Sequence, residues 1–110
     1  MDSNSKARRR LPAKEKSISD IQADKDVRVR ITGTIIGLDG GSLMVDDGTS
    51  QVEILFDKLD LLEGFKEGQL VRVITRILPL IDGYECRGEA VQDLSGIDMN
   101  LYKKAREIIG

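Results

Sequence analysis

Hydrophobic and polar residues alternate along most of the chain between Val27 and Val91. In five segments every second side chain is apolar or small, which is typical of a β-strand with one face in a core and the other in water. The pattern therefore predicts five strands, at residues 27–38, 42–46, 51–56, 70–78 and 84–91.

The same alternation predicts which side chains of each strand face the core. In the first strand these are Val27, Val29 and Ile31. In the last strand the inward positions are predicted to be Cys86, Gly88 and Ala90. The residues between them are polar or charged, so the opposite face of each strand is predicted to meet water.

Tight turns and one helical segment connect the predicted strands. Asp-Gly sequences at 39–41, 47–48 and 82–83 are typical of hairpin turns. Leu59 and Leu62, three residues apart, predict a short helix that ends at Gly64. Gly33, inside the long first strand, predicts a bulge or a sharp bend.

Helical spacing replaces the alternation after Asp93 and predicts a C-terminal α-helix over residues 98–109. Its apolar residues cover a wide arc and are Leu101, Tyr102, Ala105, Ile108 and Ile109. Because a narrow stripe would suffice to cap the helix's own domain, we predict that this arc also contacts a partner. Ile18 and Ile21 predict a short helical turn before the first strand.

The predicted order is three strands, a short helix, two strands and a terminal helix. An open five-stranded sheet would leave two edges unpaired, and closure into a barrel removes them. We therefore predict an all-β, five-stranded Greek-key barrel, with a short helix between strands three and four and a C-terminal helix. Residues 18–110 are predicted to form this single domain.

The composition argues against enzymatic activity. The 110 residues include no His and only one Cys, Cys86, so His-dependent catalysis is absent and one thiol builds neither an internal disulfide nor a zinc site. We expect Cys86 to be a small core residue. Asp46 and Asp47 are either part of a β-turn or a magnesium site. We predict a binding protein that needs no cofactor.

No segment approaches the roughly 20 apolar residues of a membrane span, and no hydrophobic signal segment follows the first residues. These features predict a protein with no membrane partner. The expected location is the cytoplasm, in association with the nucleoid, or the nucleus.

Charge is distributed unevenly along the chain. Residues 1–17 carry six cations and two anions, whereas the remainder carries 11 cations and 17 anions. The segment 1–17 has almost no hydrophobic pattern, so we predict a disordered basic tail. Its Arg8, Arg9 and Arg10 are candidate nucleic-acid contacts, and a solubilising terminus is the alternative.

Four short motifs, which together span about residues 26–92, resemble a known family of barrels. They lie at residues 27–35, 45–54, 68–73 and 82–84. In this order they resemble nucleic-acid-binding OB domains, and most of all the middle and small subunits of replication protein A, including archaeal versions. Those subunits carry a helix after the barrel that packs with partner helices. The chain departs from the pattern at Thr75, where many OB domains have Gly.

The resemblance implies binding of single-stranded DNA, which OB barrels achieve by stacking bases on aromatic side chains in a cationic groove. The chain has only four aromatic residues. Phe56 shares its face with core residues, Phe65 is placed to plug the barrel bottom, and Tyr102 belongs to the C-terminal helix. Tyr84, beside the last hairpin, is the one candidate for stacking.

Outward arginines on the first and fourth strands predict a basic stripe, because these strands are neighbours in an OB barrel. The stripe consists of Arg28, Arg30, Arg72 and Arg76, with Arg87 near it. The alternative is an ordinary solvated face whose arginines pair with Glu53, Glu85 and Glu89. We predict weak or auxiliary contact with single strands.

Leu80 and Ile81 lie near the tip of the last predicted hairpin, where water is expected. An exposed apolar tip marks a partner interface, and the alternative is that the tip folds back on the C-terminal helix.

Three functions remain open. The first is a subunit resembling those of replication protein A, which acts in DNA replication and repair and joins other OB-fold subunits, or a second copy of itself, through the C-terminal helix. The second is a purely structural OB subunit that binds protein alone. The third is an accessory OB protein for RNA or tRNA.

Overall fold

A computed structural model describes residues 12–96 of the chain. The elements in that range are β1 (Lys14–Glu15), η1 (Ile18–Asp20), β2 (Arg28–Asp39), β3 (Ser42–Asp46), β4 (Gln51–Leu55), η2 (Leu59–Leu62), β5 (Leu70–Pro79) and β6 (Tyr84–Asp93), where η denotes a 3₁₀-helix. β2 to β6 confirm the five predicted strands, and η2 confirms the short helix between the third and the fourth. The predicted helix 98–109 lies outside the described residues.

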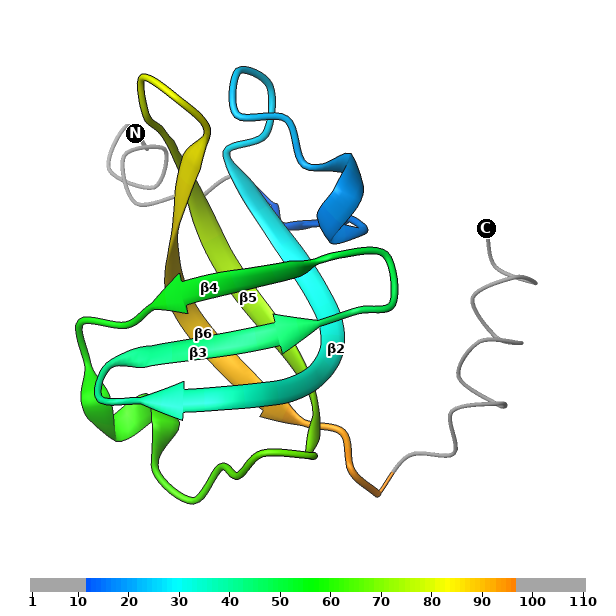
Figure 1. Ribbon diagram of the computed structural model, residues 1–110, viewed down its shortest axis with the longest axis vertical. Coiled ribbons are helices and arrows are strands. Elements are labelled where there is room, and N and C mark those ends of the chain that lie inside the picture. The colour runs from blue at the N-terminus through cyan, green and yellow to red at the C-terminus, as the bar shows by residue number, and fades with distance from the viewer. Residues whose placement is uncertain (1–11, 97–110) are drawn as a thin grey trace, which may run out of the picture.

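The five long strands close into a barrel (Figure 1). β2 pairs with β3, β3 with β4, β4 with β6, β6 with β5, and β5 returns to β2. All these pairs are antiparallel except β4–β6, which is parallel. β2 is long enough to serve two partners, because its first half pairs with β5 and its second half with β3.

The barrel interior is filled by aliphatic side chains from alternate positions of every strand, as the sequence predicts. Fully buried members are Val29, Ile31, Ile35, Leu43, Val45, Ile54, Val71 and Val73. Each such side chain contributes about 1.5–3 kcal/mol by leaving water. Phe56 is buried among them, and Phe65 packs against the same cluster. Cys86 also lies in this core, as expected.

Gly33 allows a close approach between strands, whereas the bulge in β2 lies three residues further on. The register of β2 against β3 shifts between Ile35 and Gly37, so the extra residue is Ile36. A Cβ atom at Gly33 would lie 2.6 Å from the carbonyl oxygen of Asp46. Gly33 lies where β2 changes its pairing partner from β5 to β3. A larger side chain does not fit at this position.

A second bulge corrects the predicted inward face of the last strand. Thr75 pairs with Gly88 but Ile74 pairs with Ala90, so Glu89 is the extra residue of β6. Beyond the bulge the alternation reverses, and Val91 packs against the core in place of Ala90. The prediction was therefore right for Cys86 and Gly88 and wrong for Ala90.

The end of the predicted disordered tail is part of the fold. Residues 12–17 lead into the barrel, and β1 pairs in parallel with β2, Lys14 opposite Val29 and Glu15 opposite Arg30. This short strand covers the edge of β2 that β5 does not use. Ile18 in η1 is buried, which confirms the predicted turn before the first strand. Residues 1–11 lie outside the described part of the chain.

Among residues 12–96 no helix has the length and apolar character needed to cross a membrane.

Candidate nucleic-acid interface

Three arginines form one row across the outer face of the barrel. Arg28 on β2 lies directly opposite Arg76 on β5, and Arg76 lies opposite Arg87 on β6. Their strand neighbours Val29, Thr75 and Cys86 are buried, so the arginine side chains point outward, as predicted. Neighbouring strands are about 4.8 Å apart, which brings the three arginines close enough to contact one ligand. We call these residues the arginine row.

Carboxylates hold two members of the arginine row in place. Arg28 Nε lies 2.6 Å from Glu89 Oε1, and Arg87 Nε lies 2.5 Å from Glu85 Oε2. The hydrogen bond and the charge of Glu85, with a further effect of Asp57, raise the pKa of the Arg87 guanidinium. The alternative of an ion-paired face is thus correct for Glu85 and Glu89. Glu53 instead accepts a hydrogen bond from Ser42.

Arg76, at the centre of the row, differs from its two neighbours. Its side chain is exposed, and within residues 12–96 no carboxylate lies within ion-pair distance of it. The row therefore presents one uncompensated guanidinium between two paired ones. The ion pairs of Arg87 lie at the surface, where such pairs are weak and can be exchanged for contacts with phosphate. The Arg28–Glu89 pair is more buried, with 19% and 16% of the two side chains exposed.

The other two arginines of the predicted stripe lie further along the same outer face of β2 and β5. Arg30 Nε is 3.6 Å from Glu15 Oε1, so β1 supplies its counter-charge. Arg72 lies opposite Thr32 on one side and Gln92 on the other, and Ile74 separates it from Arg76 along β5. The predicted stripe therefore continues from the arginine row to Arg30 on β2, whereas Ile74 interrupts it on β5, and its contact with nucleic acid stays a prediction.

No platform for stacking bases is present on the face that β3 and β4 turn outward. Its six outward residues are Ser42, Met44, Asp46, Gln51, Glu53 and Leu55. None of these six is aromatic or cationic, and two are carboxylates. Tyr84, the predicted stacking residue, is only partly exposed because its ring packs against the core. Burial, together with the charge of Cys86, raises the pKa of its phenol.

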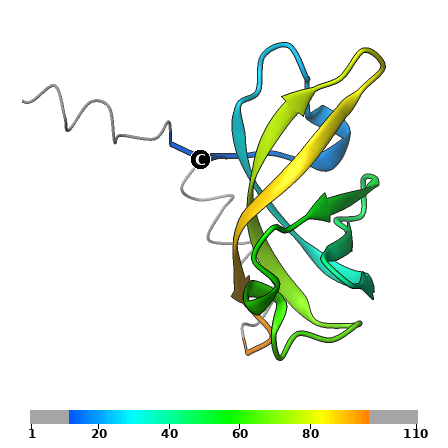
Figure 2. The same ribbon diagram turned by 90° about the vertical axis from the view of Figure 1, so that its left-hand side faces the viewer.

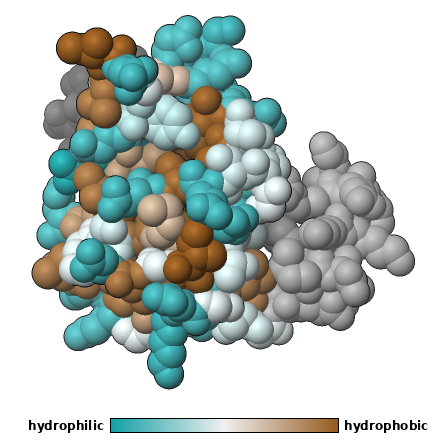
Figure 3. Space-filling model, in the orientation of Figure 1, coloured by the Kyte–Doolittle hydropathy of each residue, from teal (hydrophilic) through white to brown (hydrophobic). Residues whose placement is uncertain are grey.

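The tip of the β5–β6 hairpin is apolar and exposed, as predicted. Leu80 is 54% exposed and Ile81 is fully exposed, and the Leu80 N–H donates to the Gly83 carbonyl to close the turn. Figure 3 shows this tip as a hydrophobic cluster at the upper left of the molecule. Its role as a partner interface stays a prediction.

Val27 is a surface residue that the alternation placed inside. It is 53% exposed and lies directly before β2, which begins at Arg28. The loop before β2 and the β5–β6 hairpin lie at the same end of the barrel (Figures 1 and 2).

Some predicted site residues lie outside the described residues. They are Arg8, Arg9 and Arg10 in the tail and Leu101, Tyr102, Ala105, Ile108 and Ile109 in the predicted C-terminal helix.

The Asp46–Asp47 pair belongs to a turn. Asp46 Oδ1 accepts the Gly48 N–H at 2.7 Å, and Asp47 Oδ1 accepts the Thr49 N–H at 2.9 Å. Asp47 Oδ2 also accepts the Ile18 N–H at 2.8 Å, which joins the turn to η1. These bonds confirm the turn interpretation of the pair.

A closed five-stranded barrel with this strand order and a parallel β4–β6 pair is the OB fold. No model of a known protein family matches the chain, and no curated protein matches it in sequence. Solved structures do match it. The telomere capping protein Ten1 of Saccharomyces pombe has a TM-score of 0.70 and 21% identity, over 86% of this chain and 93% of that protein.

Two further structures agree with this comparison. A chain of the S. pombe Stn1–Ten1 complex has a TM-score of 0.64 and 22% identity, over 86% of this chain and 89% of its own length. Replication protein A of U. maydis, bound to single-stranded DNA, has a TM-score of 0.58 and 17% identity, over 91% of each chain. At these identities the likeness establishes the OB fold.

We predict that Cys86 is unreactive in the folded protein. It is 1% exposed, and burial raises the pKa of its thiol to about 11. Because the thiolate is the reactive form, Ellman's reagent at pH 8 should modify the native thiol about 100-fold more slowly than the urea-unfolded one. Rapid stoichiometric labelling of the native protein would contradict the buried placement.

Proposed function

We propose that the chain is an OB-fold subunit of an assembly that binds single-stranded nucleic acid, with DNA replication or telomere maintenance as its setting. The observation that carries this proposal is the arginine row, with Arg76 exposed between Arg28 and Arg87. The comparisons support it, because the similar structures include a telomere capping protein and replication protein A bound to single-stranded DNA. The proposal places the protein in the nucleus or at a nucleoid.

Weak binding by the isolated chain follows from the composition of its surface. Each base stacked on an aromatic side chain adds about 1–3 kcal/mol of binding free energy, and the outer face of β3 and β4 has no aromatic residue. The contact is then mainly electrostatic and sensitive to salt. Assembly with other binding subunits raises the effective concentration of such a weak contact, which is why we propose a subunit.

The hairpin tip is the described surface best suited to assembly. Leu80 and Ile81 expose apolar side chains without any packing that the described fold requires, and such residues are typical of interfaces. The proposed partners are other OB-fold subunits or a second copy of this chain. The predicted helix 98–109 is proposed to contribute to the same assembly.

The nucleic-acid role predicts that Arg76→Glu weakens binding. Fluorescence anisotropy of labelled oligo-dT with the full chain at low salt should give a dissociation constant about fivefold higher for this variant. Lys66→Glu is the matched control, since Lys66 is also an exposed cation but lies in the turn after η2, and it should change binding less than twofold. Absence of binding by the unchanged protein at low salt would favour the purely structural function.

The assembly role predicts that Ile81→Asp removes a partner without affecting folding. The side chain is fully exposed, so the free energy of unfolding should change by less than about 0.5 kcal/mol. Light scattering measures the molecular mass of the purified chain in solution. If the unchanged protein self-associates, Ile81→Asp should have a lower mass. If the unchanged protein does not self-associate, the subunit that co-purifies with it from the native host should not co-purify with the variant. Identical behaviour of both proteins would exclude the tip as an interface.

A further inference from the structure

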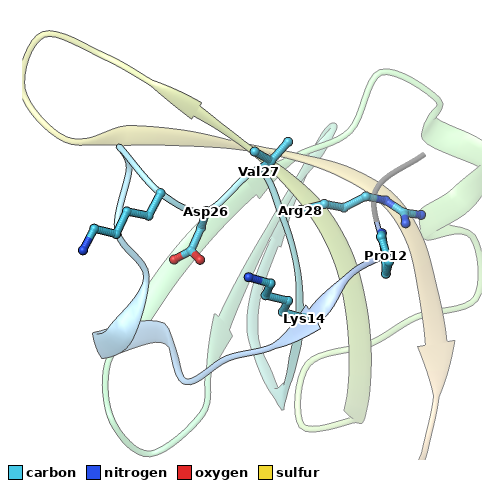
Figure 4. A pocket seen from close by; sticks show the side chains of 6 residues that line it. Pro12, Lys14, Asp26, Val27 and Arg28 are labelled. Carbon is cyan, nitrogen blue, oxygen red and sulfur yellow. The ribbon is translucent and has the colours of Figure 1, made fainter. Parts of the chain in front are cut away.

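A small cavity lies beside the arginine row, where β1, the loop before β2 and the start of β2 meet (Figure 4). Its volume is about 190 Å³, and it is lined by Pro12, Lys14, Lys25, Asp26, Val27 and Arg28. Pockets that enclose drug-sized ligands measure about 300–1,000 Å³. This cavity therefore suits a single ring system or one sugar–phosphate unit rather than a larger ligand.

The charges around the cavity favour an anion. Lys14 and Lys25 are exposed, and within the described range no carboxylate lies within ion-pair distance of either. The only acidic residue of the lining, Asp26, already pairs with Lys16 at 3.4 Å. Its Oδ2 also accepts the Gln22 N–H at 2.7 Å. The lysines therefore dominate the potential at the cavity mouth.

The cavity also has an apolar wall. Val27 is half exposed at its rim, and Pro12 contributes a ring that is likewise exposed. Contact with the face of a nucleobase would remove the apolar surface of these two side chains from water. A purely apolar ligand would leave the flanking lysines without a partner. A nucleotide supplies both a ring for the apolar wall and a phosphate for the lysines.

Arg28 connects this cavity to the arginine row. It belongs to the lining and lies opposite Arg76, which in turn lies opposite Arg87. Two steps of about 4.8 Å between strands make the row about 10 Å long, which equals roughly three stacked nucleotides at about 3.4 Å each. The row and the cavity thus form one continuous path over β6, β5 and β2.

The opposite face of the barrel offers no comparable path. Its outward residues on β3 and β4 include Asp46 and Glu53 and no cation, so a phosphate backbone is repelled there. Oligonucleotides bound by OB folds commonly follow the face of these two strands. The distribution of charge in this chain points to a different face.

We propose that a single strand crosses the barrel along the arginine row and places one unstacked base in this cavity, against Val27 and Pro12. Phosphates that flank this base contact Lys14 and Lys25, while Arg28, paired with Glu89, borders the cavity. This inference rests on the proposed function and adds to it the path of the strand and the position of one nucleotide.

Photo-cross-linking of the full chain tests the path. An oligo-dT strand with one diazirine-substituted base is irradiated with the protein at low salt, and the modified peptides are identified by mass spectrometry. Cross-links within residues 12–28 are expected. Cross-links within residues 42–55, or confined to residues 1–11, would overturn the path while leaving nucleic-acid binding intact. Absence of binding in the anisotropy experiment would instead overturn the proposed function itself.

A pair of variants tests the cavity without disturbing the core. Val27→Asp places a negative charge at the rim, and the dissociation constant for oligo-dT should rise about tenfold. Ile36→Asp is the matched control, because Ile36 is also exposed on β2, at 40%, but lies at the bulge away from the cavity. Its binding should stay within twofold of the original. Equal binding by the two variants, with both shown to be folded by circular dichroism, would overturn the cavity as a nucleotide site.

Discussion

Replacement of Gly88 by Ala is expected to lower the free energy of unfolding by about 3 kcal/mol, the upper end of the range for overpacked cores. A Cβ atom at this position would overlap three atoms of the Phe56 ring. Phe56 is buried against the aliphatic core and has no exposed side toward which it can retreat. Urea denaturation followed by circular dichroism should show a lower midpoint with an unchanged slope.

Two further variants identify the cause of this loss. Phe56→Leu shortens the side chain that the new Cβ atom would overlap. The double variant Phe56→Leu/Gly88→Ala should therefore lose less free energy of unfolding than the two single variants lose together, since the two residues are in contact. Gly37→Ala is the control for glycine in a strand, because its Cβ would meet only Met44, at 3.4 Å. It should change stability by less than about 1 kcal/mol. A Gly88→Ala protein as stable as the Gly37→Ala protein would contradict the packing.

The alternation of the sequence predicted the five long strands because each has one face in the core and one in water. β1 gave no such signal, since a two-residue strand has no periodicity. Its pairing depends on the open edge of β2 and on the ion pairs of Glu15 with Arg30 and of Lys16 with Asp26. These are tertiary contacts between segments that are distant in sequence, and the alternation of hydrophobic and polar residues does not predict such contacts.

The candidate interface was predictable only in part. The outward direction of Arg28 and Arg76 followed from the buried residues beside them in β2 and β5. Their alignment with Arg87 did not, because it depends on the register of three strands. The cavity beside Arg28 was missed because the alternation assigned Val27 to the core, whereas Val27 is 53% exposed at the end of the barrel.

The turn that contains Asp47 connects the barrel to the segment before β2. One carboxylate accepts four hydrogen bonds, from the N–H groups of Ile18, Thr49 and Ser50 and from the Thr49 hydroxyl. Burial alone would raise the pKa of Asp47, but the Thr49 hydroxyl and the three N–H groups outweigh it and hold the pKa below its usual 3.8. The ionised side chain thus stabilises both the turn and the docking of η1.

Asp47→Ala is therefore expected to lower the free energy of unfolding by about 2 kcal/mol at neutral pH, since hydrogen bonds to charged groups are worth about 1.5–3 kcal/mol each and these are partly exposed. The folded-state pKa lies below the unfolded one, so this contribution is complete above pH 3.8 and is lost as the pH falls through the folded value. Urea denaturation at pH 7 and at pH 2 should accordingly show a smaller difference between variant and original protein in acid.

Asp46→Ala, which removes two bonds of the same turn, is the control and should lower the free energy of unfolding by less. Because Asp47 holds the Ile18 N–H, hydrogen exchange of the Ile18 amide should accelerate in Asp47→Ala and not in Asp46→Ala, and equal exchange in both variants would contradict this role of the carboxylate.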